Sequence, residues 1–369
     1  MLYTALAVAT LLAFSATAHP VLGSLSLIRL PISKNPHPFT FSSLVKERTL
    51  LQTRSGTAPS ANEEVSYIVK CTIGNEAYDL ILDTGSSNTR PNRTKSPILL
   101  RRPVILSKSR MGPDLPFQLG GLTVSKQLIG VANRTSGFPG VDGIFGVGPV
   151  GLTSKTVSSM KLVPTVLDNL YKSKSIWYEA LGVYFKPLTG DATVQTNGEI
   201  TLGGHDPSKY IGKITYTPVT QVPNYSRYWG IDVSGVSYGT KSLLKSVPAI
   251  VDTGTTLIYI PQNAYYTFLH DTEGSTDPTG LPVWGTKPTQ NFVFTIGGTK
   301  FTLTPNQYLV PQAQYAHFGL DSGRYFAWIS TLGPVPDGQL SFVIGQKFLE
   351  HFYSVFDTTS RRVGLAVAR

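Results

Sequence analysis

The sequence predicts a mainly β protein built from two similar β lobes with a few short helices. Short runs rich in β-branched and aromatic residues, such as YDLILD, GEITLGG and NFVFTIGGTKFTL, are bounded by Gly, Pro or Asn, which is typical of strands separated by turns. The chain of 369 residues contains 35 Gly and 26 Pro, enough for many turns. Helices are expected only at 163–173, 262–270 and 346–352. This length is sufficient for two hydrophobic cores.

One motif is repeated in the two halves of the chain. ILDTGSSNT at 81–89 and IVDTGTTLI at 250–258 both place Asp-Thr-Gly behind an apolar pair. Each half also carries a later apolar run that ends in glycine, GIFG at 143–146 and FVIG at 342–345. The repeat predicts an N-terminal lobe at 61–210 and a C-terminal lobe at 211–369, whose Asp-Thr-Gly turns face each other.

The N-terminal region has the features of a targeting and processing segment. Residues 1–18 contain no charged side chain and end in Ala-Thr-Ala, the small-residue pattern of a secretory signal peptide; a buried N-terminal helix is the alternative. Residues 19–60, rich in Pro, Ser and basic side chains, are predicted to be a pro-segment, with a disordered tail as the alternative. No later run reaches the ~18 to 20 apolar residues needed to cross a bilayer. We therefore expect a secreted, extracellular protein that does not bind membranes.

Charge and cysteine content exclude several functional classes. The net charge of +10 is concentrated in residues 19–60 and 90–110, so the rest of the chain is near neutral and a nucleic-acid partner is not expected. The single cysteine, Cys71, excludes a disulfide within the chain and lies in a strand-like run, where a buried apolar role is expected. The six histidines form no H-x-x-x-H pair, so no metal site is predicted.

The two aspartates of the repeat, Asp83 and Asp252, are the candidate catalytic residues. Each follows an apolar strand, and the glycine of its turn lets backbone N–H groups approach the carboxylate. Two carboxyl groups within hydrogen-bond reach cannot both ionise easily, so they share a proton. One can then accept a proton from water while the other polarises a carbonyl, which is general acid-base hydrolysis of an amide.

At these residues the chain resembles the pepsin-type aspartic endopeptidases, and more closely the secreted fungal enzymes of polyporopepsin type. The resemblance covers about residues 64–89 and 119–369, including GVDGIFGVGPVGL, YWGIDVSGVSYG and VIGQKFLEHFYSVFDTTSRRVGLA. It implies a bilobal pepsin-like acid protease fold, protein or peptide substrates, no cofactor, an inhibitory pro-segment and a monomeric enzyme active at acidic pH. It also implies roles around the catalytic pair: Thr84 and Thr253 interlock beneath it, Ser86 hydrogen-bonds Asp83, and Gly85, Gly254 and Thr255 support the turns or bind substrate backbone.

Residues 90–118 depart from the family pattern. The family places a tryptophan after SSNT and then a hairpin flap whose tyrosine closes over the substrate. This chain has no Tyr or Trp between Tyr78 and Tyr171, and residues 90–110 hold seven basic side chains and no acidic one. We interpret 90–118 as an aberrant segment that replaces the flap, derived either from an incorrect gene model or from a genuine flap-less paralogue with reduced or no activity.

Other motifs give weaker predictions. The G-x-S-x-G pattern around Ser237 suggests a serine hydrolase only if a helix follows it, and a β-turn is favoured. The sequons at Asn92, Asn133 and Asn224 are candidate glycosylation sites. The alternatives to an active aspartic endopeptidase are therefore an inactive pepsin-like binding protein and, less favoured, a serine hydrolase.

Overall fold

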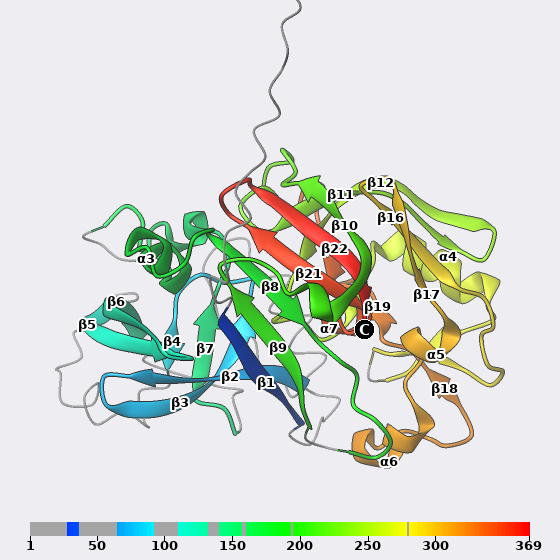
Figure 1. Cartoon of the computed structure of the whole chain (residues 1–369). Coiled ribbons are helices and arrows are strands. Elements are labelled where there is room, and N and C mark those ends of the chain that lie inside the picture. The colour runs from blue at the N-terminus through cyan, green and yellow to red at the C-terminus, as the bar shows by residue number, and fades with distance from the viewer. Residues whose placement is uncertain are drawn as a thin grey trace, which may run out of the picture.

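The structure, a computed structural model, has two β lobes joined by a central sheet (Figure 1). It describes residues 28–36, 65–91, 110–131, 140–156, 160–192, 195–278 and 280–369. In Figure 1 the first lobe, with β2 to β7, lies at the left and the second, with β11 to β18, at the right. The predicted fold class, mainly β with few short helices, is confirmed.

The largest sheet within the described ranges has twelve strands and belongs to both halves of the chain. Ten follow the order β10-β22-β21-β8-β9-β1-β2-β3-β7-β4, while β5 pairs with β2 and β6. Their bounds are β1 (Ile28–Pro36), β2 (Val65–Ile73), β3 (Glu76–Asp83), β4 (Arg90–Pro91), β5 (Arg110–Leu119), β6 (Leu122–Val131), β7 (Gly143–Gly146), β8 (Ala180–Tyr184), β9 (Gln195–Leu202), β10 (Tyr210–Pro218), β21 (Phe352–Asp357) and β22 (Arg362–Ala368).

The second lobe contains a seven-stranded sheet, ordered β17-β16-β11-β12-β20-β13-β19, and a small sheet, β14-β15-β18. The strands are β11 (Gly230–Tyr238), β12 (Lys241–Val251), β13 (Ile258–Tyr259), β14 (Ser275–Thr276), β15 (Pro282–Trp284), β16 (Phe292–Ile296), β17 (Thr299–Leu303), β18 (Tyr325–Phe326), β19 (Ile329–Ser330) and β20 (Val343–Ile344).

The helices among the described residues are short. They are η2 (Val150–Thr153), α3 (Val166–Lys172), η3 (Pro207–Lys209), α4 (Gln262–Asp271), α5 (Pro305–Tyr308), η4 (Gln312–Gln314), α6 (Tyr315–Phe318) and α7 (Gln346–Leu349). α3, α4 and α7 fall where the sequence predicted helices. α3 starts at a capping box, in which Asp168 N donates to Thr165 Oγ1 at 3.1 Å and Thr165 N donates to Asp168 Oδ2 at 2.6 Å.

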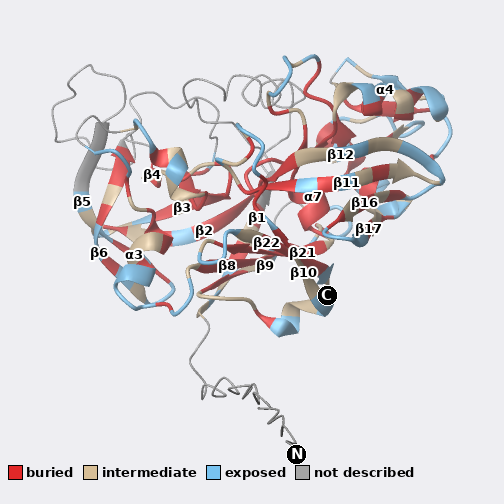
Figure 2. Ribbon diagram, turned by 90° about the horizontal axis from the view of Figure 1, so that it is seen from above, coloured by how far each residue is buried: buried red, intermediate tan, exposed pale blue. Residues whose placement is uncertain are grey.

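Buried residues follow the centre of both lobes (Figure 2). In the second lobe the core is strongly aromatic: Phe292 packs edge-on against Phe268 and Tyr308, with ring centroids 4.7 and 5.0 Å apart. Such pairs add to the stabilisation from apolar burial. The aromatic core therefore contributes to stability without a disulfide within the chain, whose one cysteine, Cys71, is buried and free.

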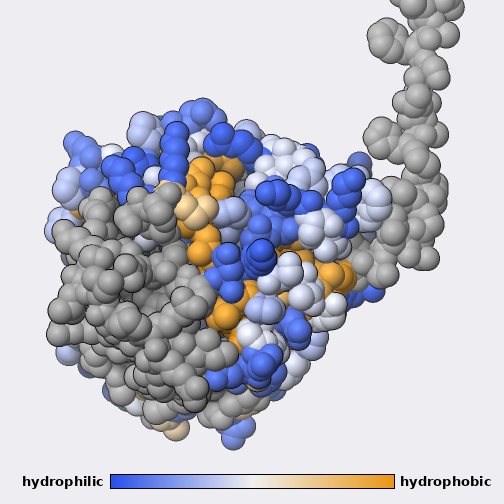
Figure 3. Space-filling model, turned by 90° about the vertical axis from the view of Figure 1, so that its left-hand side faces the viewer, coloured by the Kyte–Doolittle hydropathy of each residue, from blue (hydrophilic) through white to orange (hydrophobic). Residues whose placement is uncertain are grey.

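Exposed apolar side chains of the first lobe cluster around α3. Figure 3 shows the left-hand face of Figure 1, where the hydrophobic surface of the described residues lies in narrow strips between hydrophilic side chains. The large exposed side chains on either side of α3 and within it are Met160, Leu162, Tyr171, Trp177 and Tyr178. The remaining apolar residues of this lobe are mostly directed into its core.

Part of the predicted pro-segment is a strand of the central sheet. β1 pairs antiparallel with β9 from Ile28 to Lys34 and with β2 from Ser33 to Pro36. The alternative interpretation of 19–60 as a disordered tail is therefore wrong for residues 28–36, which form β1. The remainder of 37–60, like the predicted signal peptide 1–18, lies outside the described residues.

Part of the predicted aberrant segment is also a regular strand. β5 forms a hairpin with β6, and from Asp114 to Leu119 its side chains alternate between more exposed and more buried positions, with Phe117 and Leu119 buried. Phe117 lies opposite Ile73 of β2. The sequence interpretation resumed the family resemblance at residue 119, but β5 already begins at Arg110. Residues 92–109 lie outside the described part of the chain.

Candidate active site

The two Asp-Thr-Gly turns are built in the same way. β3 ends at Asp83 and runs parallel to β7, with Asp83 opposite Gly146. β12 ends at Val251, next to Asp252, and runs parallel to β20, with Val251 opposite Ile344. The two apolar residues before each motif lie in a buried strand that pairs in parallel with a second buried strand. Such strands are apolar on both faces, which explains why the motif follows continuous apolar residues in both halves.

Reciprocal hydrogen bonds between Thr84 and Thr253 lock the two turns together. Thr84 N donates to Thr253 Oγ1 at 3.0 Å, and Thr253 N donates to Thr84 Oγ1 at 2.9 Å. Each hydroxyl also donates to the opposite lobe, Thr84 Oγ1 to Val251 O at 3.1 Å and Thr253 Oγ1 to Leu82 O at 2.9 Å. Both threonines are fully buried. The predicted interlock is present and joins the lobes directly beneath the aspartates.

Each aspartate is held by donors from its own turn. Asp83 Oδ1 accepts from Gly85 N at 2.8 Å, and Asp83 Oδ2 accepts from the Ser86 hydroxyl. Asp252 Oδ1 accepts from Gly254 N at 3.0 Å, and Asp252 Oδ2 accepts from Thr255 Oγ1 at 2.8 Å. These donors fix the orientation of both carboxyl groups.

The two carboxyl groups face each other across the lobe boundary. A Cβ placed on Gly85 would lie 2.5 Å from Asp252 Oδ2, and one placed on Gly254 would lie 2.5 Å from Asp83 Oδ1. Any side chain at either position would clash with the opposite aspartate, so both turns require glycine. Asp83 is 3% exposed and Asp252 is fully buried. The structure thus brings together all eight residues predicted for the site: Asp83, Thr84, Gly85, Ser86, Asp252, Thr253, Gly254 and Thr255.

The geometry around Ser237 contradicts a serine hydrolase. Ser237 lies within β11, opposite Ser242 of β12, and residues 239–240 form the turn of this hairpin. No helix follows the serine as a nucleophile elbow requires. Within the described ranges, no three His, Cys, Asp or Glu side chains form a group suited to a metal ion.

The other candidate residues occupy different surroundings. Asn224 Nδ2 donates to Gly338 O at 2.9 Å. Asn92 and Asn133 lie outside the described residues. Cys71 is buried in β2, and this burial raises the pKa of its thiol well above the ordinary value. Among the residues that the structure describes, no helix has the length and apolar character to span a membrane.

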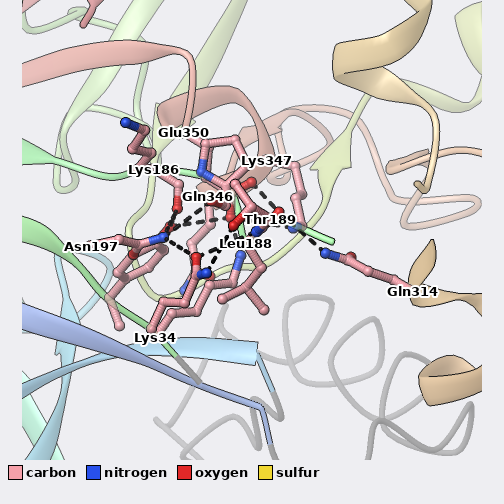
Figure 4. Close-up of polar contacts among 12 residues, drawn as sticks. Lys34, Lys186, Leu188, Thr189, Asn197, Gln314, Gln346, Lys347 and Glu350 are labelled. Carbon is pink, nitrogen blue, oxygen red and sulfur yellow. Dashed lines mark hydrogen bonds and ion pairs between the residues drawn. The ribbon is translucent and has the colours of Figure 1, made fainter. Parts of the chain in front are cut away.

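A buried charge cluster that the sequence did not reveal lies where β1 meets α7 (Figure 4). The Lys34 ammonium pairs with Glu350 Oε1, and Lys347 Nζ lies 3.2 Å from Glu350 Oε2. Burial lowers the pKa of Lys34 to about 7, against the opposing attraction of Glu350. Burial also opposes ionisation of Glu350, but the two ammonium groups outweigh it and lower the pKa of Glu350 to about 2. The cluster anchors β1 to the second lobe.

Comparisons with known proteins identify the family. The profile described as eukaryotic aspartyl protease matches residues 116–368. The chain belongs to this family. The protease is 41% identical over 332 residues to polyporopepsin from Irpex lacteus, with 85% of this chain and 97% of that protein covered. It is 29% identical to cathepsin E from Mus musculus, over 83% and 81% of the two chains.

The fold comparison agrees. The crystal structure of the aspartic proteinase from Irpex lacteus matches the protease with a TM-score of 0.76 and 35% sequence identity, covering 93% of this chain and 98% of that one. The predicted resemblance to pepsin-type and polyporopepsin-like enzymes is therefore confirmed, and the protease is an aspartic endopeptidase by family. The family profile begins at residue 116, within β5.

Proposed function

We propose that the protease hydrolyses peptide bonds at acidic pH, with Asp83 and Asp252 activating a water molecule. The observation that carries this proposal is the opposed placement of the two buried carboxyl groups above the reciprocal threonine lock. Two carboxyl groups in this arrangement share one proton, because ionising both would place like charges together away from water. An acidic medium keeps that proton in place.

Each member of the pair then has a distinct task. The ionised carboxylate accepts a proton from water while the water oxygen attacks the carbonyl carbon, and the protonated partner gives its proton to the carbonyl oxygen. The tetrahedral intermediate breaks down when a carboxyl proton passes to the amide nitrogen and the C–N bond breaks. A hydroxyl proton of the intermediate returns to the pair, which restores the starting state.

The residues around the two aspartates hold the carboxyl groups in place and are proposed to bind the substrate. Ser86 and Thr255 hold the outer carboxylate oxygens by hydroxyl hydrogen bonds. Gly254 and Thr255 are proposed to bind the backbone of an extended peptide, whose residues beside the cleaved bond are bulky and apolar. Preorganised donors of this kind avoid reorganisation during the reaction.

The protease is further proposed to be a secreted, monomeric zymogen. Residues 1–18 are the signal peptide, and residues 19–60 are a pro-segment that inhibits the enzyme until it is cut. The pairing of β1 with β2 and β9 supports a pro-segment that folds onto the body of the enzyme. N-terminal sequencing of the secreted protein before and after acid treatment tests this, since a mature protein that begins upstream of Ile28 contradicts it.

A second candidate function is substrate binding with little or no turnover. It is favoured by the sequence of 90–118, where the flap tyrosine and its supporting tryptophan are absent. Without a flap the site excludes water and positions substrate less well. Peptide mapping of the natural secreted protein distinguishes the causes, because recovery of peptides from 92–109 excludes an incorrect gene model.

The experiment that tests the main proposal is cleavage of a denatured protein at acidic pH by this exact chain. The matched variants are Asp83→Asn and Asp191→Asn, the latter at an exposed aspartate in the loop after β8. Cleavage that pepstatin inhibits, that Asp83→Asn abolishes and that Asp191→Asn leaves intact is the expected result. Pepstatin binding without cleavage supports the second candidate, and neither binding nor cleavage by a folded preparation contradicts both.

A further inference from the structure

We propose that Trp229 is a positioning residue for the carboxyl pair, because it connects the segment behind the Asp83 turn with the strand that ends next to Asp252. This inference rests on the proposed function of that pair and adds a residue from outside both Asp-Thr-Gly motifs. Trp229 lies one residue before β11 and is 2% exposed. Its contacts form a link between the two lobes that is separate from the threonine lock.

The indole of Trp229 reaches across the lobe boundary to the segment that follows β7. Its Nε1 donates to Val147 O at 3.3 Å. That carbonyl belongs to the peptide group whose N–H, on Gly148, donates to Ser86 O at 2.7 Å. The Ser86 hydroxyl in turn donates to Asp83 Oδ2. One peptide group is thus held at its oxygen by the second lobe and at its N–H by the turn that carries Asp83.

This peptide group is packed tightly against the first turn. Val147 is 3% exposed, and its N–H donates to Asp83 O at 2.9 Å. Position 148 requires glycine, because a Cβ there would lie 2.8 Å from both Ser86 O and Thr84 O. A displacement of the segment after β7 would therefore be transmitted to the backbone of the turn.

The backbone of Trp229 is bonded to the strand that leads to the second aspartate. Val251 N donates to Trp229 O at 2.9 Å, and Val251 is the last residue of β12, next to Asp252. The indole is oriented by Phe356 of the central sheet, whose ring lies 5.5 Å away between centroids at an angle of 56°. One residue therefore holds the strand before Asp252 with its carbonyl and the segment behind Asp83 with its side chain.

The lobe repeat places another aromatic residue at the corresponding position of the first half. Tyr67 lies one position before the β2 residue that pairs with Ile81. Trp229 lies one position before the β11 residue that pairs with Ile250. Both side chains bond to the opposite half of the chain, but the Tyr67 hydroxyl donates to Glu350 Oε1, in the buried charge cluster, at 3.3 Å. Trp229 instead reaches a segment that is bonded to an Asp-Thr-Gly turn, so the positioning role is assigned to it.

The expected effect on the reaction is partial. Hydrolysis requires both carboxyl groups to lie within reach of the same water molecule and carbonyl, so their mutual alignment determines the rate of the chemical step. Removing the indole donor releases the Val147 carbonyl from the second lobe. The threonine lock and the donors of each turn remain, so the alignment should loosen without being lost.

The test compares Trp229→Phe with Trp284→Phe, since each variant removes a buried indole N–H and keeps an aromatic ring. Trp284 is also 2% exposed, and its Nε1 donates to Thr272 Oγ1 at 2.9 Å. Its ring lies 5.4 Å from that of Phe268, between centroids, at an angle of 57°, which nearly equals the geometry of Trp229 on Phe356. Trp284 belongs to the small sheet of the second lobe, so it is a matched control for the loss of an indole.

The readouts are kcat and KM for a synthetic peptide, the affinity for pepstatin and the Tm. For Trp229→Phe we expect kcat to fall about threefold to tenfold with KM nearly unchanged, and pepstatin affinity to fall by about the same factor. The pH of highest activity should not move, because no ionisable group changes. Trp284→Phe is expected to lower the Tm by a similar amount and to leave kcat, KM and pepstatin affinity at their parent values.

A third protein separates the hydrogen bond from the volume of the ring. Benzothienylalanine at position 229 keeps the shape of the indole but has no N–H to donate, so it should reproduce the loss of kcat with little change in packing. It also decides the question if Trp229→Phe does not fold. Full kcat in this protein would overturn the positioning role.

Failure of the positioning role and failure of the proposed function give different results. If the parent cleaves substrate but Trp229→Phe alters only the Tm, or if Trp284→Phe lowers kcat equally, the positioning role is wrong and the proposed function stands. If the parent binds pepstatin without cleavage, the affinities of the same variants decide in the same way. If the folded parent neither cleaves nor binds, the proposed function is wrong and the positioning role falls with it.

Discussion

Removal of one hydroxyl from the threonine lock is expected to weaken the whole molecule. In Thr253→Val the side-chain volume is preserved, but Thr84 N loses its acceptor at 3.0 Å and Leu82 O loses its donor at 2.9 Å. Both groups are buried at the lobe boundary. A buried backbone group without a partner costs about 1–3 kcal/mol, so the variant should lose about 2–6 kcal/mol of unfolding free energy.

Calorimetry provides the assay. For ~300 ordered residues, unfolding entropy of about 2 cal/mol/K per residue converts each kcal/mol into about 1–2 °C, so the Tm is expected to fall by about 3–10 °C. Thr253→Ser is the matched control, because it keeps the hydroxyl and loses a methyl group worth about 1 kcal/mol. A Thr253→Val protein that melts within 1 °C of the parent, or no lower than Thr253→Ser, would refute the account of the lock.

Three further predictions concern charge and space. Burial opposes ionisation of Glu350, but the two lysines outweigh it and lower its folded pKa to about 2, so above pH 4.5 the ionised Glu350 stabilises the fold. In the uncut chain, kept intact by an Asp83→Asn background, the stability advantage over the same chain with Glu350→Gln should shrink by about 3 kcal/mol in urea unfolding as the pH falls from 4.5 to 2. Burial, together with a neighbouring aspartate, raises the pKa of Glu179 to about 8, so the folded state loses stability as the pH rises from 4.5 toward 8. Glu179→Gln should therefore have a higher Tm than the parent, by a difference that grows over this pH range. A difference in Tm that stays constant would contradict this. Gly254→Ala should abolish turnover because its methyl group would lie 2.5 Å from the opposite carboxylate, whereas Gly285→Ala, with open space around it, should retain full activity in the same cleavage assay.

The close approach of Asp83 and Asp252, the proposed catalytic pair, could be predicted because its sequence signal is local and repeated. Asp83 and Asp252 each sit in the same three-residue turn behind the same apolar run, and each turn provides its own donors. The lobe repeat followed from the same pattern. Short-range sequence patterns were therefore sufficient to predict those parts of the site whose contacts come from neighbouring residues along the chain.

The unpredicted features depend on partners far away in sequence. β1 contains two prolines, Pro31 and Pro36, and a buried lysine, Lys34, and these residue types are not typical of a central strand. The buried ammonium is tolerated because Glu350, 316 residues later, pairs with it. Likewise, Pro113 and Pro116 obscured the alternation in β5, whose pairing with β2 and β6 is tertiary. Gln346 has no recognisable motif of its own, because its hydrogen bonds to Thr253 O and Thr255 O form only when α7 reaches the second turn.

The threonine lock also determines how the two lobes can move relative to each other. Its four hydrogen bonds lie at the buried point where the lobes meet, so a rocking motion of one lobe against the other would pivot there. Displacement in such a motion grows with distance from the pivot. Such a motion would displace the parts of each lobe that lie far from the lock, while Asp83 and Asp252, one residue from the pivot, would keep their mutual alignment.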